Sequence, residues 1–296
     1  MLQHEFSWSA SRYTLFNHCK RAYYYQYYGS WRGWEEDIDT RTKKIYLLKN
    51  LRTVEEWISG IFKRSLNEAL NSGRWDINRQ KRRAFSMLRN DICDIRSKSW
   101  EHSPKCINID ELYYDTATVN RVVSSGERIL NTIFANLAES KIKRRIEEVS
   151  YLKFKRFRTP AYFYNDGIKV WCSPDIIWED GGVLYICNFF TGDPQISNSW
   201  ALKSGVDAIF AKKEWMQRKV DAVSIFPDQP PPPAPVHITG NIKEIKSLIK
   251  TSSDEMLALT NLDTEIYEES FANCADSTIC RRCKYREICS DFLTKE

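Results

Sequence analysis

The chain has 296 residues, of which 42% are hydrophobic, and 44 basic against 39 acidic residues give it a formal net charge of +5. This length and apolar content suit one elaborated, packed domain with an appendage. The sequence has neither a run of about 18 apolar residues nor a charged-then-apolar leader, which excludes a bilayer-spanning helix, so we expect a cytoplasmic protein with no membrane partner.

Apolar spacing predicts helices over residues 6–28, 47–70, 79–96 and 127–146. Ser9 and Ser11 are candidate N-caps of the first helix, and Gly29 is its expected end. From residue 151 the pattern alternates, which favours strands through 168–178 and 183–190, joined by a hairpin at the Asp180-Gly181 signal. Residues 200–219 return to helix, so the order of elements predicts an α/β architecture.

The segment PDQPPPPAP at residues 227–235 is typical of a stiff polyproline linker. A proline-binding partner groove is the alternative.

Cysteine is the most informative residue type in this chain. Cys280, Cys283 and Cys289 follow the spacing C-x2-C-x5-C, and Cys19 lies far upstream. A second close pair, which structural zinc sites commonly have, is missing, whereas a cubane iron-sulfur cluster needs four thiolates without pairing. Cys274 is interpreted as a bystander, with replacement of one ligand as the alternative. Four cysteines that stand singly among apolar residues are expected to be small buried hydrophobes: Cys93, Cys106, Cys172 and Cys187.

The segment SASRYTLFNHCKRAYYYQYYGSW at residues 9–31, with the cysteine trio, resembles the RecB-like iron-sulfur branch of the PD-(D/E)XK nucleases, which includes AddB-type subunits and CRISPR-associated exonucleases. The resemblance implies a [4Fe-4S] cluster held by Cys19, Cys280, Cys283 and Cys289. It implies an α/β fold with a mixed sheet flanked by helices as nuclease core, a helical insertion and a C-terminal cluster segment. The expected parts are the N-terminal segment 1–45, the helical region 46–150, the core 151–226, the linker 227–235 and the C-terminal helical segment 236–296.

The same resemblance implies that the catalytic site is degenerate. Ser173-Pro174-Asp175 matches the first part of the family hairpin, and counting back from Thr191-Gly192 puts Asn188 at the acidic position and Phe190 at the lysine position. Lys63 stands at the usual histidine position, and Lys203 and Asp207 stand in the helix after the hairpin. We therefore expect Lys63 or Lys203 to pair with Asp175, and Mg²⁺ or Mn²⁺ to bind poorly. Relocated carboxylates are the alternative; the candidates are Glu147, Glu148, Glu179, Asp180 and Asp193.

Basic runs beside the hairpin are candidates for contacts with nucleic-acid phosphates, although solvated surface is the alternative. They comprise Lys141, Lys143, Arg144, Arg145, Lys153, Lys155, Arg156 and Arg158. Trp31, Trp34 and Tyr28 are candidates for stacking on bases, with core packing as the alternative.

The sequence thus favours a pseudonuclease, meaning a DNA- or RNA-binding or scaffold subunit of a DNA-processing or defence complex, alongside a helicase, nuclease or effector partner. One alternative is an active metal-dependent deoxyribonuclease with relocated ligands. The other is a protein-interaction module that does not contact nucleic acid.

Overall fold

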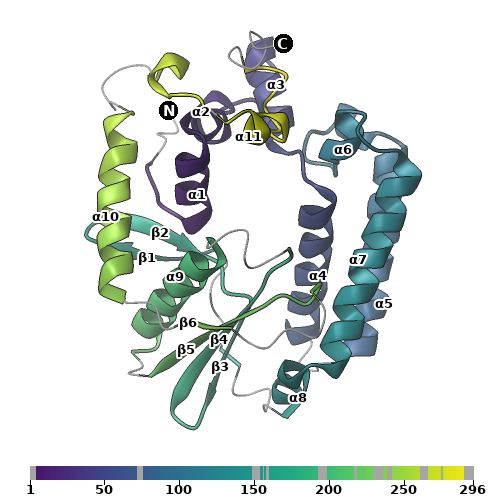
Figure 1. Ribbon diagram of the computed structural model, residues 1–296, viewed down its shortest axis with the longest axis vertical. Coiled ribbons are helices and arrows are strands. Elements are labelled where there is room, and N and C mark those ends of the chain that lie inside the picture. The colour runs from purple at the N-terminus through teal and green to yellow at the C-terminus, as the bar shows by residue number, and fades with distance from the viewer. Residues whose placement is uncertain are drawn as a thin grey trace. The chain divides into compact units, whose positions relative to one another are not determined.

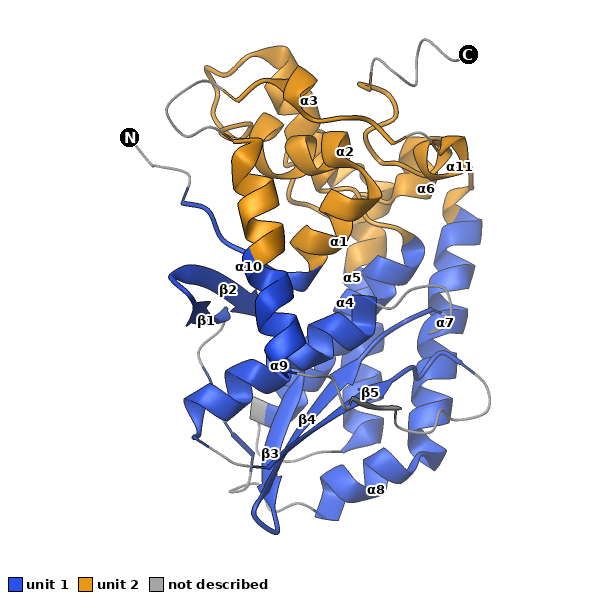
Figure 2. Ribbon diagram, turned by 60° about the vertical axis from the view of Figure 1, so that its left-hand side comes forward, with its two compact units in different colours: residues 1–10, 54–90, 120–250 blue, residues 11–53, 91–119, 251–296 orange. Residues whose placement is uncertain are grey.

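The computed structural model divides the chain into two compact units, each assembled from three separate stretches of sequence (Figure 2). Unit 1 comprises residues 1–10, 54–90 and 120–250, and unit 2 comprises residues 11–53, 91–119 and 251–296. The structure describes residues 5–71, 76–148, 154–155, 157, 160–192, 199–216, 219–229, 236–238, 242–260, 266–274 and 276–289. Both sheets lie in unit 1 and are flanked by helices, so the fold is mixed α/β as predicted.

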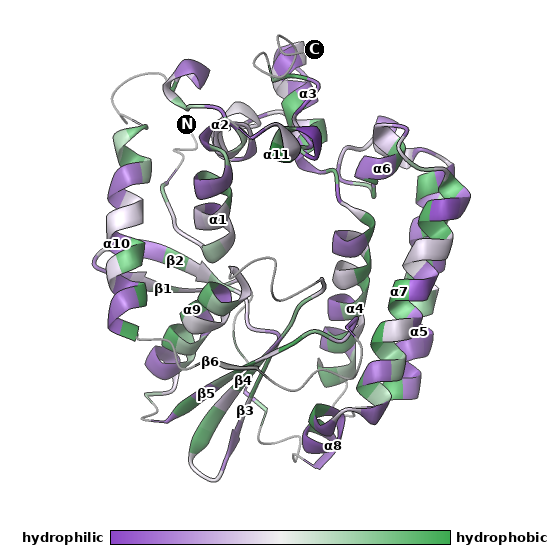
Figure 3. Cartoon of the chain, in the orientation of Figure 1, coloured by the Kyte–Doolittle hydropathy of each residue, from purple (hydrophilic) through white to green (hydrophobic). Residues whose placement is uncertain are grey.

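The larger sheet of unit 1 has four strands in the order β3-β4-β5-β6 (Figure 1). They are β3 (Ile176–Asp180), β4 (Val183–Phe189), β5 (Val220–Ile225) and β6 (Val236–Ile238). The pair β4–β5 is parallel, and the other two pairs are antiparallel. Parallel neighbours need a crossover, which the helix α9 (Ser199–Glu214) supplies. Figure 3 shows hydrophobic residues along β4 and β5, in keeping with their burial.

Two short turns fix the registers of the antiparallel hairpins in unit 1. Gly181 and Gly182 join β3 to β4 with φ of +55° and +75°, which confirms the predicted hairpin. Asp166 and Gly167 join β1 (Ala161–Asn165) to β2 (Ile168–Cys172) with φ of +49° and +80°. Residues other than glycine rarely adopt two successive positive φ values, so these turns set the strand pairing of each hairpin.

The helices of unit 1 are α4 (Val54–Asn71), the first part of α5 (Ile77–Arg96), α7 (Val119–Glu139), α8 (Lys141–Glu148) and the first part of α10 (Ile242–Ala258). Phe62 on α4 packs against Phe134 on α7 and Phe189 on β4, with ring centroids 5.9 and 5.3 Å apart. A Cβ on Gly126 would lie 3.1 Å from the Trp57 ring and 3.0 Å from Ile58. The glycine therefore permits the close approach of α7 to α4.

Unit 2 holds α1 (Ala10–His18), α2 (Lys20–Tyr24), the π-helical turn η1 (Tyr25–Gly29), α3 (Thr40–Lys49), η2 (Ser99–Glu101), α6 (Asp110–Tyr113), η4 (Glu268–Ser270) and α11 (Ser277–Arg281). The helix α1 begins at the last residue of unit 1. The core of unit 2 gathers Tyr25, Ile45, Leu48 and Tyr285 from two helical segments and the C-terminal stretch. Arg21 ties the chain ends by donating to the main-chain oxygen of Phe271 at 2.8 Å.

Three of the predicted helices are divided in the structure. The first breaks at Cys19, whose Sγ accepts a hydrogen bond from the main-chain N–H of Ala22 and caps α2. The last breaks at Ser140, whose Oγ bonds to the Leu137 carbonyl and the Lys143 N–H. Short polar side chains compete in this way with helical main-chain bonds. The predicted helix 47–70 is likewise interrupted between α3 and α4.

None of the helices in the described part of the chain has the length and apolar character that a membrane crossing requires.

Candidate functional site

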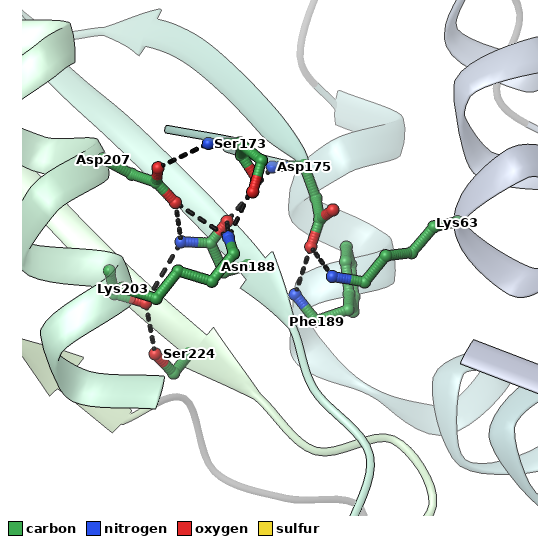
Figure 4. A network of polar contacts seen from close by, with 9 residues as sticks. Lys63, Ser173, Asp175, Asn188, Phe189, Lys203, Asp207 and Ser224 are labelled. Atoms are coloured by element: carbon green, nitrogen blue, oxygen red, sulfur yellow. Dashed lines mark hydrogen bonds and ion pairs between the residues drawn. The ribbon is translucent and has the colours of Figure 1, made fainter. Parts of the chain in front are cut away.

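Asp175 follows Ser173 and Pro174 in the bend between β2 and β3. Its Oδ2 accepts hydrogen bonds from Lys63 Nζ at 2.9 Å and from the main-chain N–H of Phe189 at 2.8 Å (Figure 4). The Asp175 side chain is only 10% exposed and that of Lys63 28%. The expected pairing of Lys63 with Asp175 is therefore confirmed.

Lys203, one turn before Asp207 on α9, lies at the centre of a second polar cluster. Its Nζ donates to Asp207 Oδ2 at 2.8 Å, to Asn188 Oδ1 at 3.1 Å and to the main-chain oxygen of Ser173 at 2.8 Å. The Asp207 carboxylate also accepts the Ser173 N–H at 2.9 Å, and its side chain is 1% exposed. Lys203 thus pairs with Asp207, not with Asp175.

The charge on Lys203 is maintained by these neighbours. Burial disfavours the ammonium, but the attraction of Asp207 and then of Asp175, with the hydrogen bond to Asp207, outweighs it. The pKa of Lys203 is consequently raised above its ordinary value of 10.5. At neutral pH a positive charge is fixed beside Asp207.

The side-chain amide of Asn188 both accepts and donates hydrogen bonds. Its Oδ1 accepts the main-chain N–H of Asp175 at 3.1 Å, while its Nδ2 donates to Asp207 at 2.9 Å and to Ser204 Oγ at 3.1 Å. Ser204 in turn bonds to Ser224 on β5 at 2.9 Å. A carboxylate has no N–H to donate, so the acidic residue expected at this position in a nuclease would break the bond to Asp207 and repel it.

Phe190 places an aromatic ring beside both ammonium groups. The Lys63 and Lys203 Nζ atoms lie 5.6 and 5.5 Å from its centroid, and the ring stacks on Phe226 at 5.6 Å. Phe190 stands at the sequence position that the resemblance assigns to the catalytic lysine. All six predicted residues of the degenerate site are therefore neighbours in unit 1.

The two carboxylates of this site are balanced by the two ammonium groups. A unit positive charge about 4 Å from another opposes it by about 4 kcal/mol at an effective dielectric near 20, and twice that for a divalent ion. Within the described residues, no group of three or more His, Cys, Asp or Glu side chains is arranged to hold a metal ion. Of the alternative carboxylates, Glu147 pairs with Lys143 and Glu179 with Lys155, whereas Asp193 lies outside the described residues.

The predicted basic run on α8 forms a solvent-facing stripe. Lys141, Arg144 and Arg145 are exposed, while Ile142 and Ile146 on the opposite face are buried. The Arg145 guanidinium also lies 4.4 Å from the ring centroid of Tyr185. Of the second run, Lys155 is described, and Lys153, Arg156 and Arg158 lie outside the described residues.

A separate candidate site lies in unit 2, where Cys19, Cys280, Cys283 and Cys289 line one cavity of about 100 Å³. Cys274 lines the same cavity, as do three arginines: Arg21, Arg281 and Arg286. The pKa of Cys283 is raised to about 11, chiefly by burial and also by the neighbouring Cys19, Cys289 and Cys280, against the lowering effect of a hydrogen bond from the Tyr285 N–H. All nine cysteines of the chain are free thiols.

The donor set of this cavity can be tested for its fit to a metal group. A single zinc ion requires sulfurs converging at about 2.3 Å on one point, whereas a cubane takes one thiolate per iron, so its ligands surround a volume. The four cysteines line one cavity together with three arginines, whose charge would offset that of a thiolate-ligated cluster.

The other cysteines follow the prediction in part. Cys172 and Cys187 are buried, at 7% and 0% exposure, as expected. The prediction is wrong for Cys93, which is exposed, and Cys106 is only half-buried. Cys93 lies on the solvent side of α5, whose inward positions at that level are Ile92 and Ile95.

Comparison with known proteins gives little further information. No protein-family model matches the chain, and no curated protein matches it. A solved structure titled "Crystal structure of SSO0001" is 13% identical, covers 78% of this chain and 94% of its own, and has a TM-score of 0.31. At that TM-score the likeness carries no argument about fold or function.

Several participants in the two sites were missed by sequence reasoning. Ser204 and Ser224 complete the cluster around Asn188, and Glu268 bonds to Arg21 beside the cysteine cavity. Ser204 directly follows Lys203, and this adjacency was the one available signal. Nothing local in the sequence pairs residue 21 with residue 268.

Proposed function

We propose that this chain is a catalytically inactive iron-sulfur protein with a PD-(D/E)XK-like nuclease core that binds nucleic acid as a subunit of a DNA-processing or defence complex. The observation that carries the proposal is the placement of the two ammonium groups. Lys63 bonds to Asp175, the one carboxylate left at a position that a nuclease would use for a metal, and Lys203 bonds to the neighbouring Asp207. Metal-dependent hydrolysis needs that negative charge free for Mg²⁺ or Mn²⁺.

The central experiment combines cleavage and binding. Purified protein is incubated with single- and double-stranded DNA and RNA, with and without Mn²⁺, and examined for products and for mobility shifts. We expect shifts that weaken with salt and no cleavage. Cleavage that disappears in Asp175→Ala would establish an active nuclease. The absence of both a mobility shift and cleavage would support a protein-interaction module.

A metal titration tests the charge argument directly. The wild type should take up no Mn²⁺ at the Asp175 site, whereas Lys63→Ala combined with Lys203→Ala frees both carboxylates and should bind it measurably by calorimetry. Lys212→Ala, an exposed lysine on the same helix α9, is the matched control. Tight Mn²⁺ binding by the wild type that is lost in Asp175→Ala would contradict the proposal.

The proposed [4Fe-4S] cluster would be held by Cys19, Cys280, Cys283 and Cys289. Its role would be structural, because it would join positions about 260 residues apart, and such a tie contributes about 4–5 kcal/mol by the chain-entropy model. Brown protein absorbing broadly near 400 nm, with matching iron and sulfide contents, is the expected result. Colourless protein that holds zinc would overturn it.

The cellular setting follows from the same chemistry. Thiolate ligands and unpaired cysteines suit a reducing compartment, so we propose the cytoplasm. A protein that has lost its own catalytic charge needs an active partner, and a helicase, nuclease or effector would supply the chemistry. Co-purification with such a partner is the test of that part.

A further inference from the structure

Figure 1 labels the two strands of the hairpin β1–β2, which belongs to unit 1. This hairpin presents two tyrosines to solvent. Along β1, Ala161, Phe163 and Asn165 are buried, while Tyr162 and Tyr164 are 36% and 52% exposed. Alternate residues of a strand point to opposite faces, so both tyrosines lie on the outer face. Large aromatic side chains left in water in this regular pattern call for a physical reason.

The opposite strand completes this outer face. Trp171 lies directly across from Tyr162, and Lys169 lies directly across from Tyr164. We name these four residues, Tyr162, Tyr164, Lys169 and Trp171, the aromatic ribbon face. It joins three aromatic rings and one cation on a surface two strands wide.

The rings and the cation of the aromatic ribbon face contact one another. Tyr162 meets Tyr164 and Trp171 edge to face, with centroids 5.8 and 5.5 Å apart. The Lys169 Nζ lies 4.8 Å from the Tyr162 centroid and 4.5 Å from the Trp171 centroid. Glu5 lies 4.0 Å from this ammonium; the Glu5 side chain is 73% exposed and that of Lys169 is 21% exposed, so water screens the pair. A phosphate would compete with Glu5 for the ammonium.

Contacts with the rest of unit 1 fix the position of the β1–β2 hairpin. Phe163 and Val170 are buried on its inner side, and Lys213 of α9 donates to the Tyr164 carbonyl at 2.6 Å. The main chain of Trp8 pairs with β2 through bonds at 2.8 Å to Lys169 and from Trp171. The aromatic ribbon face is therefore ordered before any partner binds, which lowers the entropy lost on binding.

We propose that the aromatic ribbon face binds an unpaired nucleic-acid strand, with bases stacking on Tyr162 and Tyr164 and Lys169 contacting a phosphate. This inference rests on the nucleic-acid binding of the proposed function and adds the strand type and the surface. Exposed aromatics that accept any base, joined to cations, are how sequence-tolerant single-strand binders work. Tyrosine and tryptophan also favour protein interfaces, but lysine is depleted there, so a central lysine favours the anionic partner.

The test measures fluorescence anisotropy of labelled oligothymidylate and of a labelled duplex with the full-length protein. Tyr162→Ala combined with Tyr164→Ala should weaken oligothymidylate binding by about tenfold or more while changing duplex binding less than about twofold. Tyr162→Phe combined with Tyr164→Phe keeps both rings and should restore the affinity. Lys169→Ala should reduce the salt slope by about one. Tyr267→Ala, a 57% exposed tyrosine of unit 2, is the matched control and should bind as the wild type does.

The outcomes separate this inference from the function on which it rests. A wild type that binds neither probe overturns both. A wild type that binds the duplex alone, or a folded double-alanine variant that keeps full oligothymidylate affinity, overturns the aromatic ribbon face and leaves the proposed function standing. Unchanged oligothymidylate affinity with lost self-association in that variant would assign the face to a protein contact, against the proposal.

Discussion

Asp207 shows how one buried side chain organises its surroundings. Its carboxylate accepts bonds from Lys203, Asn188 and the Ser173 main chain, with 1% of the side chain exposed. Removing one partner of a buried ion pair leaves the other charge without compensation, which is more damaging than removing both. Asp207 is therefore required for stability as well as for the electrostatics of the site.

Asp207→Asn should destabilise the protein by about 3 kcal/mol in urea unfolding near neutral pH, because the Lys203 charge loses its counterion. The pKa of Lys203 is raised in the folded state, so its stabilising contribution is complete below 10.5 and is lost as the pH rises through the higher folded value. The difference in the free energy of unfolding between wild type and Asp207→Asn should therefore narrow in strong alkali. Glu214→Gln, at the exposed end of the same helix, should change stability by less than about 0.5 kcal/mol.

The five cysteines around the cavity of unit 2 provide a matched series. Serine at Cys19, Cys280, Cys283 or Cys289 should reduce the iron content and the absorbance near 400 nm. Cys274→Ser, at a thiol that lines the same cavity, should retain both. A larger loss in Cys274→Ser than in Cys19→Ser would make Cys274 the fourth ligand.

At the residue scale the sequence identified positions better than partners. Motif counting found Asp175, Asn188, Phe190, Lys203 and Asp207, which the fold brings together. It could not decide which lysine would reach Asp175, because that depends on where α4 and α9 pack. The spacing of Lys203 and Asp207, one helical turn apart, did carry the signal for their pairing.

Among the elements, α4 and α7 approach each other closely at Gly126, where an added Cβ would lie within 3.1 Å of both Trp57 and Ile58. Gly126→Val should lower stability by about 2 kcal/mol, because the added methyl groups meet Trp57 and Ile58. Thermal unfolding followed by circular dichroism measures the effect. Ser124→Val places the same residue on the exposed side of α7, and its change should stay within about 0.7 kcal/mol. Equal losses in the two variants would mean that helix propensity, not packing, is responsible.

The β3–β4 hairpin was easier to predict than the helix ends, whereas the β1–β2 hairpin at Asp166-Gly167 was not predicted. The Asp-Gly signal before β4 is local and sufficient, since two positive φ values admit few residues. The breaks at Cys19 and Ser140 depend on a thiol and a hydroxyl that cap a following helix. Apolar spacing continues through both positions, so periodicity alone runs the helices together.

For the molecule as a whole, Glu268 connects the most distant parts of unit 2. Its carboxylate bonds to Arg21 at 3.0 Å, to Arg41 at 2.8 Å and to the Tyr25 hydroxyl at 2.5 Å. Burial would raise the pKa of Glu268, but the bonds from Tyr25 and Arg41 and the nearby arginine charges outweigh it, and the net pKa is lowered. Its contribution is complete above the unfolded value of 4.5 and is lost as the pH falls through the folded value.

Glu268→Gln should therefore destabilise unit 2 by about 3 kcal/mol at neutral pH. The difference in the free energy of unfolding from wild type should diminish as the pH falls from 4.5 through the lowered folded pKa, at which the wild-type carboxylate becomes protonated. Urea unfolding across pH measures this. Glu269→Gln, the adjacent residue, is the matched control, and a difference that grows in acid would contradict the argument.

The α/β class was predictable because alternation and helical spacing are local signals, but the division into interleaved units was not. The core contacts of unit 2 join residues near 25 and 48 to Tyr285, and no local pattern specifies such a pairing.

Unit 2 takes its first stretch from residues 11–53 and its last from residues 251–296. On a translating ribosome, Ile45 and Leu48 emerge long before Tyr285, against which they pack, and at about 5–20 residues per second the delay is on the order of tens of seconds. Throughout that interval the apolar faces of the nascent chain lack their final neighbours. The order of synthesis therefore leaves the N-terminal segment, including the Cys19 thiol, without its C-terminal neighbours until the last stretch has been made.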